Sequence, residues 1–175
     1  MHQEQRDFLA GVDGRLKGLK VLEFGSLDIN GSARDVYPKA AEWVGVDWRD
    51  GPAVDEVSLA HEWSGDKDFD AFVTGEMLEH DPYWRDSLAN GVAHIKPDGI
   101  VVITCAGPGR KSHRPDCAPK GHYENLAPAV LESALKEFCV EIKVISGRDG
   151  KDVYATARKR KAVPHKVTKS KRWTR

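Results

Sequence analysis

The sequence predicts an α/β fold in which a doubly wound, mostly parallel sheet ends in a C-terminal antiparallel hairpin. Short apolar runs alternate with segments of helical periodicity, and several of these runs end in glycine or a carboxylate. The hairpin is predicted because Asp149-Gly150 separates two strand-like runs that have no helix between them. A chain of 175 residues is typical of one domain, which we assign to residues 1–157.

The N-terminal part of the chain contains one predicted helix and the first predicted strand. Apolar side chains recur at helical spacing over residues 3–17, and Gly18 fits the end of that helix. Residues 19–25 follow as a buried strand that runs into a glycine turn. A short helical segment over residues 31–37 is halted near Pro38.

Three further strands are expected over residues 43–47, 54–57 and 69–74. Asp81-Pro82 then favours a helix start, with Asp as the N-cap and Pro at the first helical position. A Lys-Pro-Asp-Gly turn at residues 96–99 leads into 100–104, the most strand-like run and the expected centre of the sheet.

The chain departs from this alternation after the central strand. Residues 106–125 are rich in Gly, Pro, His and Arg, which is typical of a functional or disordered loop. A helix over residues 128–138 and strands over 140–144 and 153–157 complete the predicted sheet.

Composition argues against a membrane protein and against a disulfide-stabilised one. No apolar run approaches the roughly 20 residues of a membrane span, and the polar N-terminus lacks the apolar core of a signal peptide. Three scattered cysteines do not indicate a disulfide framework. We therefore expect a cytoplasmic protein in a reducing compartment.

The net charge of zero conceals a basic C-terminus. Residues 158–175 hold nine Lys or Arg and no acid, which leaves 18 basic against 27 acidic residues in the rest of the chain. Such a segment can indicate contact with nucleic acid, but we predict a disordered, solvated tail. A protein that binds a cofactor without catalysis, or that associates with nucleic acid through this tail, remains the alternative function.

The first predicted strand indicates where a ligand binds. Glu23 lies at the carboxyl end of that strand and Gly25 at the turn after it, where an open α/β sheet places its ligands. Asp47 ends the second strand, 22 residues after Gly25, where an acid can accept hydrogen bonds from ribose hydroxyls. Trp48, the next residue, could cover an adenine face or pack against the sheet edge.

The spacing of the glycines limits which class of ligand the turn can bind. A pyrophosphate needs closely spaced glycines, whereas five residues separate Gly25 from Gly31, and the chain has no P-loop motif. The signals indicate a ligand with ribose, adenine and an amino-acid-like end but no phosphates. S-adenosylmethionine meets that description.

Several motifs, spread over residues 19–157, resemble those of the class I S-adenosylmethionine-dependent methyltransferases, in particular their small type 11 members. They are Val21-Leu-Glu-Phe-Gly-Ser26, Trp43-Val-Gly-Val-Asp-Trp48, Ala60-His61, Phe69–His80 and Ile95–Thr104. The resemblance implies a Rossmann-like fold, with S-adenosylmethionine as the cofactor. The glycine loop departs from the usual Gly-x-Gly-x-Gly pattern and is similar to a Gly-Ser-x-Asp-x-Asn-Gly variant.

The resemblance also implies a role for individual residues. The methionine end of the cofactor would be lined by Glu23, Gly25 and Ser26, the ribose and adenine by Asp47, Trp48, Ala60 and His61, and the sulfonium side by Glu76 and Met77. His61 could otherwise be an ordinary histidine of a surface loop.

The acceptor site is expected in the loop after the central strand. Methyl transfer from a sulfonium needs alignment, and a base only if the acceptor must lose a proton. We predict His122 and Tyr123 as acceptor-site residues, with His113 and Asp116 as further candidates for the base and His80 orienting the loop. A small-molecule acceptor is favoured over a polymer.

Two other motifs are given a structural interpretation. Asp81-Pro82-Tyr83-Trp84 is similar to the Asp-Pro-Pro-Tyr motif of amino-group methyltransferases acting on DNA, but it fits a helix start better. The His, Cys and Asp residues in and beside the loop are Cys105, His113, Asp116, Cys117 and His122. Their spacing matches no common zinc motif, so we predict no metal site.

Overall fold

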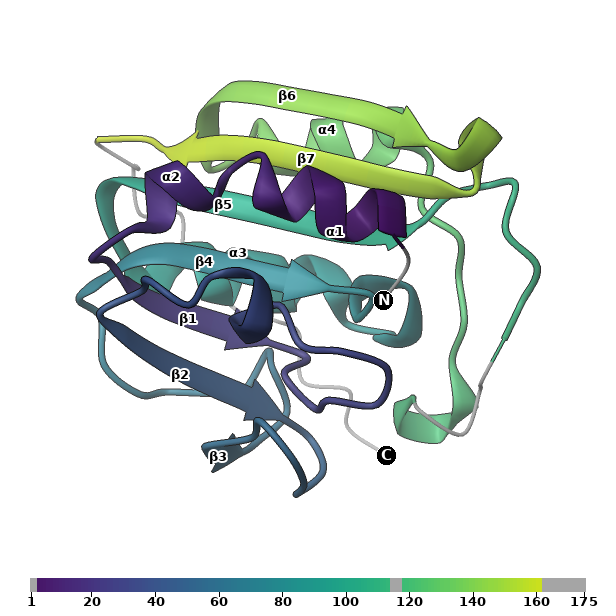
Figure 1. Cartoon of the computed structure of the whole chain (residues 1–175). Helices are drawn as coiled ribbons and strands as arrows, with labels where there is room; N and C mark the ends of the chain where they lie inside the picture. The colour runs from purple at the N-terminus through teal and green to yellow at the C-terminus, as the bar shows by residue number, and fades with distance from the viewer. Residues whose placement is uncertain (1–2, 114–117, 162–175) are drawn as a thin grey trace, which may run out of the picture.

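The computed structural model describes residues 3–113 and 118–161, which form a seven-stranded sheet between two layers of helices (Figure 1). The strands are β1 (Lys20–Phe24), β2 (Glu42–Asp47), β3 (Glu56–Val57), β4 (Phe69–Gly75), β5 (Ile95–Ala106), β6 (Cys139–Gly147) and β7 (Asp152–Lys159). Their order across the sheet is β3-β2-β1-β4-β5-β7-β6. Neighbours from β3 to β5 are parallel, and β7 runs antiparallel to both β5 and β6. The predicted sheet and its closing hairpin are confirmed.

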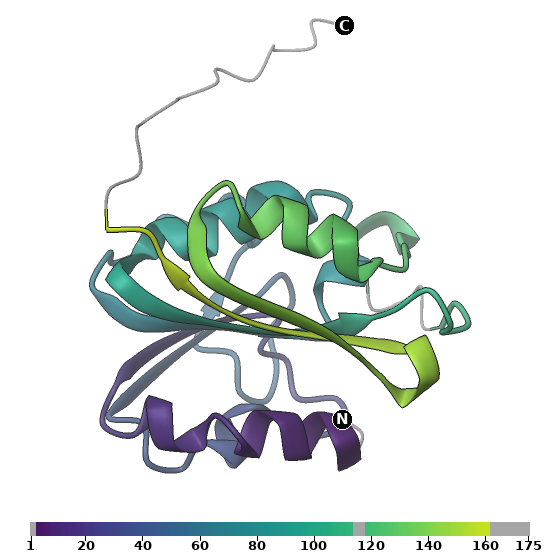
Figure 2. The same cartoon turned by 90° about the horizontal axis from the view of Figure 1, so that it is seen from above.

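Helices cover both faces of this sheet, as Figure 2 shows. On one face lie α1 (Gln3–Ala10) and α2 (Asp13–Leu16), and on the other lie α3 (Trp84–His94) and α4 (Pro128–Leu135). Phe72 and Val73 are neighbours on β4, and each is fully buried in a different apolar cluster, one on each face. Burial on both faces explains why the central strands read as continuous apolar runs.

Four short 3₁₀ helices complete the described elements: η1 (Arg34–Val36), η2 (Leu78–His80), η4 (Pro119–Gly121) and η5 (Arg148–Gly150). The segment predicted as helical over residues 31–37 is therefore one 3₁₀ turn. At the hairpin, Asp149 and Gly150 both have positive φ, at 55° and 83°. Residues of this type tolerate such a turn, which is why the dipeptide predicted it.

Three helix boundaries differ from the prediction, and one of them is that α4, expected over residues 128–138, ends at Leu135. The single helix expected over residues 3–17 is two helices, and Gly11, a residue of low helix propensity, lies in the break between them. The third helix begins at Trp84 and not at Pro82. Asp81 still organises this start, since its Oδ1 accepts from the Tyr83 N–H at 2.8 Å and its Oδ2 from the Ser87 hydroxyl at 2.5 Å.

Strand β5 includes the Lys-Pro-Asp-Gly turn. Phe69 pairs with Ile95 but Ala71 pairs with Ile100, so residues 96–99 bulge out opposite Asp70. Cys105 and Cys139 are buried free thiols. Of the predicted basic tail, residues 158–161 are described; residues 162–175, like Asp116 and Cys117, lie outside the described residues. Across the described parts of the chain, no helix has both the length and the apolar character needed to cross a membrane.

Candidate functional site

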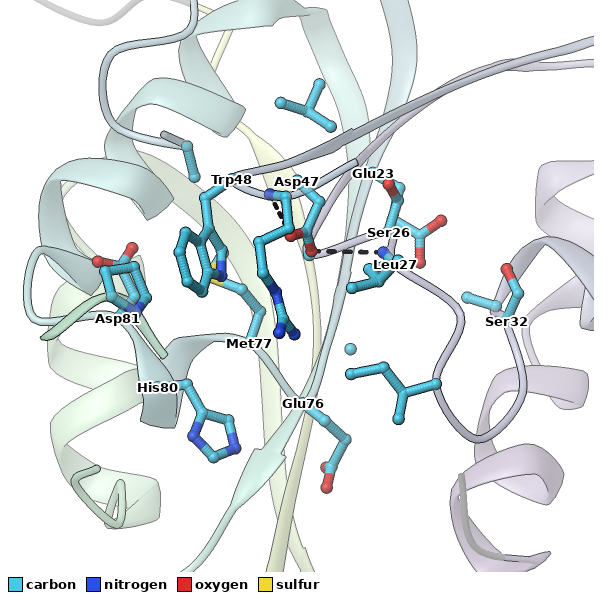
Figure 3. A pocket seen from close by; sticks show the side chains of 18 of the residues that line it. Glu23, Ser26, Leu27, Ser32, Asp47, Trp48, Glu76, Met77, His80 and Asp81 are labelled. Atoms are coloured by element: carbon cyan, nitrogen blue, oxygen red, sulfur yellow. Dashed lines mark hydrogen bonds between the residues drawn. The ribbon is translucent and has the colours of Figure 1, made fainter. Parts of the chain in front are cut away.

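A cavity of about 490 Å³ opens at the carboxyl ends of β1, β2 and β4 (Figure 3). An open parallel sheet places its ligands at this edge. All nine residues that the resemblance assigned to a cofactor line this cavity: Glu23, Gly25, Ser26, Asp47, Trp48, Ala60, His61, Glu76 and Met77. They come from four separate segments of the chain, which the fold brings together around one cavity.

Two buried carboxyl groups lie at the ends of adjacent strands. Glu23 is 3% exposed and accepts a hydrogen bond from the Trp43 indole N–H at 2.9 Å. Burial raises the pKa of Glu23 to about 8, although the Trp43 hydrogen bond and the Arg34 charge act in the opposite direction. Burial also raises the pKa of Asp47.

Asp47 fixes the glycine loop to the tip of β2. Its Oδ2 accepts from the Leu27 amide at 3.3 Å and its Oδ1 from the Arg49 amide at 3.0 Å, the two dashed lines of Figure 3. The loop is closed locally as well, because Asp28 Oδ1 accepts from the Gly31 amide at 2.6 Å. A carboxylate held in this way has its orientation set before any ligand arrives.

Gly25 is required by its surroundings. Its φ is 77°, in the left-handed region, and a Cβ there would lie 2.4 Å from the Cβ of Met77. Gly25 therefore lets the segment after β4 pack directly against the end of β1. Next to it, the buried Ser26 hydroxyl has no hydrogen-bond partner among the described residues.

Trp48 and His61 both line the cavity and both contact a neighbouring side chain. Trp48 is 37% exposed, and the Arg49 guanidinium lies 4.9 Å from its ring centroid. The His61 ring lies 4.3 Å from the Tyr83 ring, measured between centroids. Both predicted side chains are thus held at the mouth of the cavity by neighbouring side chains.

A charged group that the sequence did not reveal lies on the β4 side. Arg110 Nη1 is 2.5 Å from Glu76 Oε2 and 3.0 Å from Asp152 Oδ1, where Asp152 is a buried residue of β7. Burial raises the pKa of Glu76, and Arg110 opposes that rise. Membership of the irregular loop was the only sequence signal for Arg110, and nothing local pairs it with a residue 42 positions away.

Helix α1 also contributes to the cavity, which sequence reasoning missed. Gln5 lines the cavity, is 1% exposed, and donates from Nε2 to Thr104 Oγ1 at 2.5 Å. A polar residue on the inner face of an amphipathic helix would have been the signal.

One of the predicted acceptor residues lines the cavity and others do not. Of the four candidates, His113 lines the cavity, His122 and Tyr123 are not among its described lining residues, and Asp116 lies outside the described residues. The Tyr123 hydroxyl donates to the Lys111 carbonyl at 3.4 Å, and burial raises the pKa of Tyr123 to about 12. His122 Nε2 lies 3.9 Å from Glu124 Oε2.

His80 lies between these groups. Its ring centroid is 5.3 Å from that of His113 and 5.2 Å from that of Tyr123. Burial, together with the positive charge that His113 can carry, lowers the pKa of His80 to about 4. The adjacent Glu79 is fully buried, and burial followed by the charge of Glu76 holds its pKa well above the usual value.

The fold is that of solved S-adenosylmethionine-dependent methyltransferases. The chain is similar to 1,6-didemethyltoxoflavin-N1-methyltransferase from Burkholderia thailandensis, with a TM-score of 0.67 and 20% identity over 90% of this chain and 79% of that one. It is also similar to the N-methyltransferase NodS from Bradyrhizobium japonicum, with a TM-score of 0.66 and 18% identity over 90% of this chain and 86% of that one.

A further similar structure is an S-adenosylmethionine-dependent methyltransferase from Archaeoglobus fulgidus, with a TM-score of 0.62 and 17% identity over 88% of this chain and 94% of that one. No protein-family model and no curated protein matches the sequence. At these identities the likeness establishes the fold, so the function has to be argued from the cavity.

Proposed function

We propose that the chain is a methyltransferase that binds S-adenosylmethionine in this cavity and transfers its methyl group to a small-molecule acceptor. One observation carries the proposal: the nine residues expected to hold that cofactor, from four segments of the chain, line a single cavity. The Burkholderia and Bradyrhizobium enzymes were both crystallised with S-adenosylhomocysteine, the first also with 1,6-didemethyltoxoflavin, a small molecule.

The polar groups of the cavity fit such a cofactor. Asp47 presents a fixed carboxylate suited to ribose hydroxyls, and the unpartnered hydroxyl of Ser26 offers a further hydrogen bond. The cavity volume of about 490 Å³ falls within the usual range for ligand sites. Gly25 has no side chain to fill the cavity, and the Met77 side chain packs directly against its backbone.

S-adenosylmethionine supplies a methyl group that is already activated on a sulfonium. The residues of the chain then have to align the acceptor and, where the acceptor carries a proton, remove it. In this proposal His113 faces the acceptor, and Tyr123, whose ring centroid lies 5.1 Å from that of His113, holds it in place. With its pKa at about 12, Tyr123 stays protonated and acts as a hydrogen-bond donor.

We expect Asp47→Ala to weaken binding of S-adenosylmethionine and S-adenosylhomocysteine about 10- to 100-fold. The change removes a charged hydrogen-bond acceptor and frees the Leu27 amide that Asp47 holds. Isothermal titration calorimetry measures the affinity. The control is Asp66→Ala, which removes an exposed carboxylate 3.7 Å from Lys20, at the start of β1 and away from its carboxyl end, and which should leave the affinity unchanged. A wild-type protein that binds neither compound would refute the proposal.

Glu23 should link cofactor binding to pH. A cationic amino group placed beside Glu23 favours the ionised carboxylate, so binding near pH 7 should release a proton that the free protein holds, since the pKa of Glu23 is about 8. Calorimetry in buffers of different ionisation enthalpy counts that proton. Glu23→Gln should abolish the release; equal proton release by the variant would show that its source is another group.

A further inference from the structure

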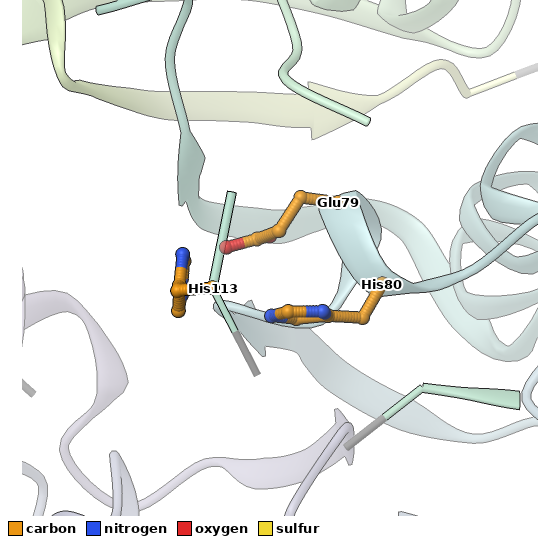
Figure 4. Close-up of side chains that lie close together, drawn as sticks. All are labelled: Glu79, His80 and His113. Carbon is orange, nitrogen blue, oxygen red and sulfur yellow. The ribbon is translucent and has the colours of Figure 1, made fainter. Parts of the chain in front are cut away.

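We infer that Glu79, His80 and His113 form a binding site for one divalent transition-metal ion, such as Zn²⁺, in the wall of the cavity. Each side chain offers one ligand atom, and these atoms lie within 4.8 Å of one another. Figure 4 shows the three side chains converging on one point, two from η2 after β4 and one from the loop after β5.

The donor set is chemically suited to such an ion. Two imidazole nitrogens and one carboxylate are ligands that Zn²⁺ prefers, with bonds of about 2.0–2.2 Å. Tetrahedral geometry with these bonds puts the ligand atoms about 3.4 Å apart. The three side chains would therefore close by no more than about 1.5 Å around an ion, a movement that side-chain rotations can supply.

A second, independent observation concerns the burial of Glu79. Its side chain is 0% exposed, and neither carboxyl oxygen makes a hydrogen bond of ordinary geometry among the described residues, although the backbone groups of Glu79 and Ala106 lie near enough to lower its pKa. Buried carboxyl groups are almost always paired, because burying one without a partner is costly. Arg110, the nearby cation, bonds to Glu76 and to Asp152.

His80, the residue after Glu79, also has a buried polar atom without a hydrogen bond of ordinary geometry among the described residues. The residue is 8% exposed, and the atom is its Nδ1. Consecutive residues of one 3₁₀ turn thus each carry a buried polar atom without a hydrogen bond of ordinary geometry, beside a third residue that can complete the set. A single bound ion would satisfy both of them.

The position of the site gives the ion a use. His80 and His113 both line the cavity, so coordination positions left open by three protein ligands would face it. The oxygen of an acceptor hydroxyl bound there would lose its proton to water more readily, so that no protein side chain would need to take it. This consequence rests on the proposed function, whereas the binding of the ion does not.

Metal binding by the full chain tests the inference directly. The protein is prepared without a histidine tag, stripped with a chelator, and titrated with Co²⁺ followed by visible absorption and with Zn²⁺ followed by calorimetry, both in the absence of S-adenosylmethionine. We expect one equivalent of either ion to bind. Glu79→Gln and His113→Asn should each lower the affinity at least about tenfold and change the Co²⁺ spectrum.

The control variant is His122→Asn, which removes an imidazole from the same loop but outside the cluster and should bind both ions as the wild type does. Circular dichroism checks that each variant is folded. If Glu79→Gln fails to fold, His113→Asn decides alone, because His113 is a half-buried loop residue. Wild-type affinity in a folded His113→Asn variant, or no saturable binding by the wild type, would overturn the inference.

Discussion

Gly25→Ala should destabilise the protein by about 2–5 kcal/mol and abolish cofactor binding. An alanine at φ 77° costs about 1–2 kcal/mol, and its Cβ would lie 2.4 Å from Met77 Cβ and 2.6 Å from Met77 Cγ. Overpacking of this kind adds about 1–3 kcal/mol. Relief requires the end of β1 and the segment after β4 to separate, and both segments line the cavity. Urea unfolding gives the stability and calorimetry the affinity.

Substitutions of two other glycines separate the two causes of the lost stability, which are the positive φ and the crowding against Met77. Gly18 has a similar φ of 73° but nothing within 4 Å of its Cβ position, so Gly18→Ala should show only the backbone cost. Gly14 has neither a positive φ nor a neighbour within 4 Å, so Gly14→Ala should be neutral or slightly stabilising. If Gly25→Ala were no more harmful than Gly18→Ala, the crowding against Met77 would be of no consequence.

The sheet was predictable because its signals are local. Runs such as residues 69–74 and 100–104 are mostly apolar, which follows from burial on both faces of a parallel sheet. Asp149 and Gly150 both have positive φ in the turn, and Asp and Gly are residue types that tolerate positive φ, so the dipeptide predicts the turn. The break after α1 was not predicted because the apolar residues keep their helical spacing across Gly11. The helix ends before Gly11 all the same, and glycine is a residue of low helix propensity.

The cofactor side of the site was predictable for a related reason. Glu23 and Asp47 end strands, and the carboxyl ends of parallel strands meet at one edge. The other side depends on contacts between distant segments. Glu79 was not predicted to be a ligand because nothing in Met-Leu-Glu-His shows that the carboxyl is buried, and His113 approaches it from a loop that follows the next strand.

Replacing Glu23 should change how stability depends on pH. Below about pH 4.5 the carboxyl is protonated in both the folded and the unfolded chain. Between about pH 4.5 and 8 the unfolded chain releases the proton while the folded chain retains it, so the free energy of unfolding falls as the pH rises. Glu23→Gln removes this dependence. At pH 8 the variant should be more stable than the wild type by up to about 4–5 kcal/mol.

The variant has to be compared with the wild type at each pH, because burial also raises the pKa of Asp47 and adds its own dependence to both curves. Glu56→Gln is the matched control. Glu56 Oε2 accepts from the Trp63 indole N–H at 2.7 Å, the same bond that Glu23 makes with Trp43, but Glu56 is exposed on β3. Glu56→Gln therefore tests whether loss of a carboxylate–indole hydrogen bond at an exposed position changes the curve by itself. Denaturant unfolding from pH 4 to 9 measures all three proteins. Parallel curves for the wild type and Glu23→Gln would mean that Glu23 is ionised in the folded protein, and that the cavity already holds the charge a cationic ligand would meet.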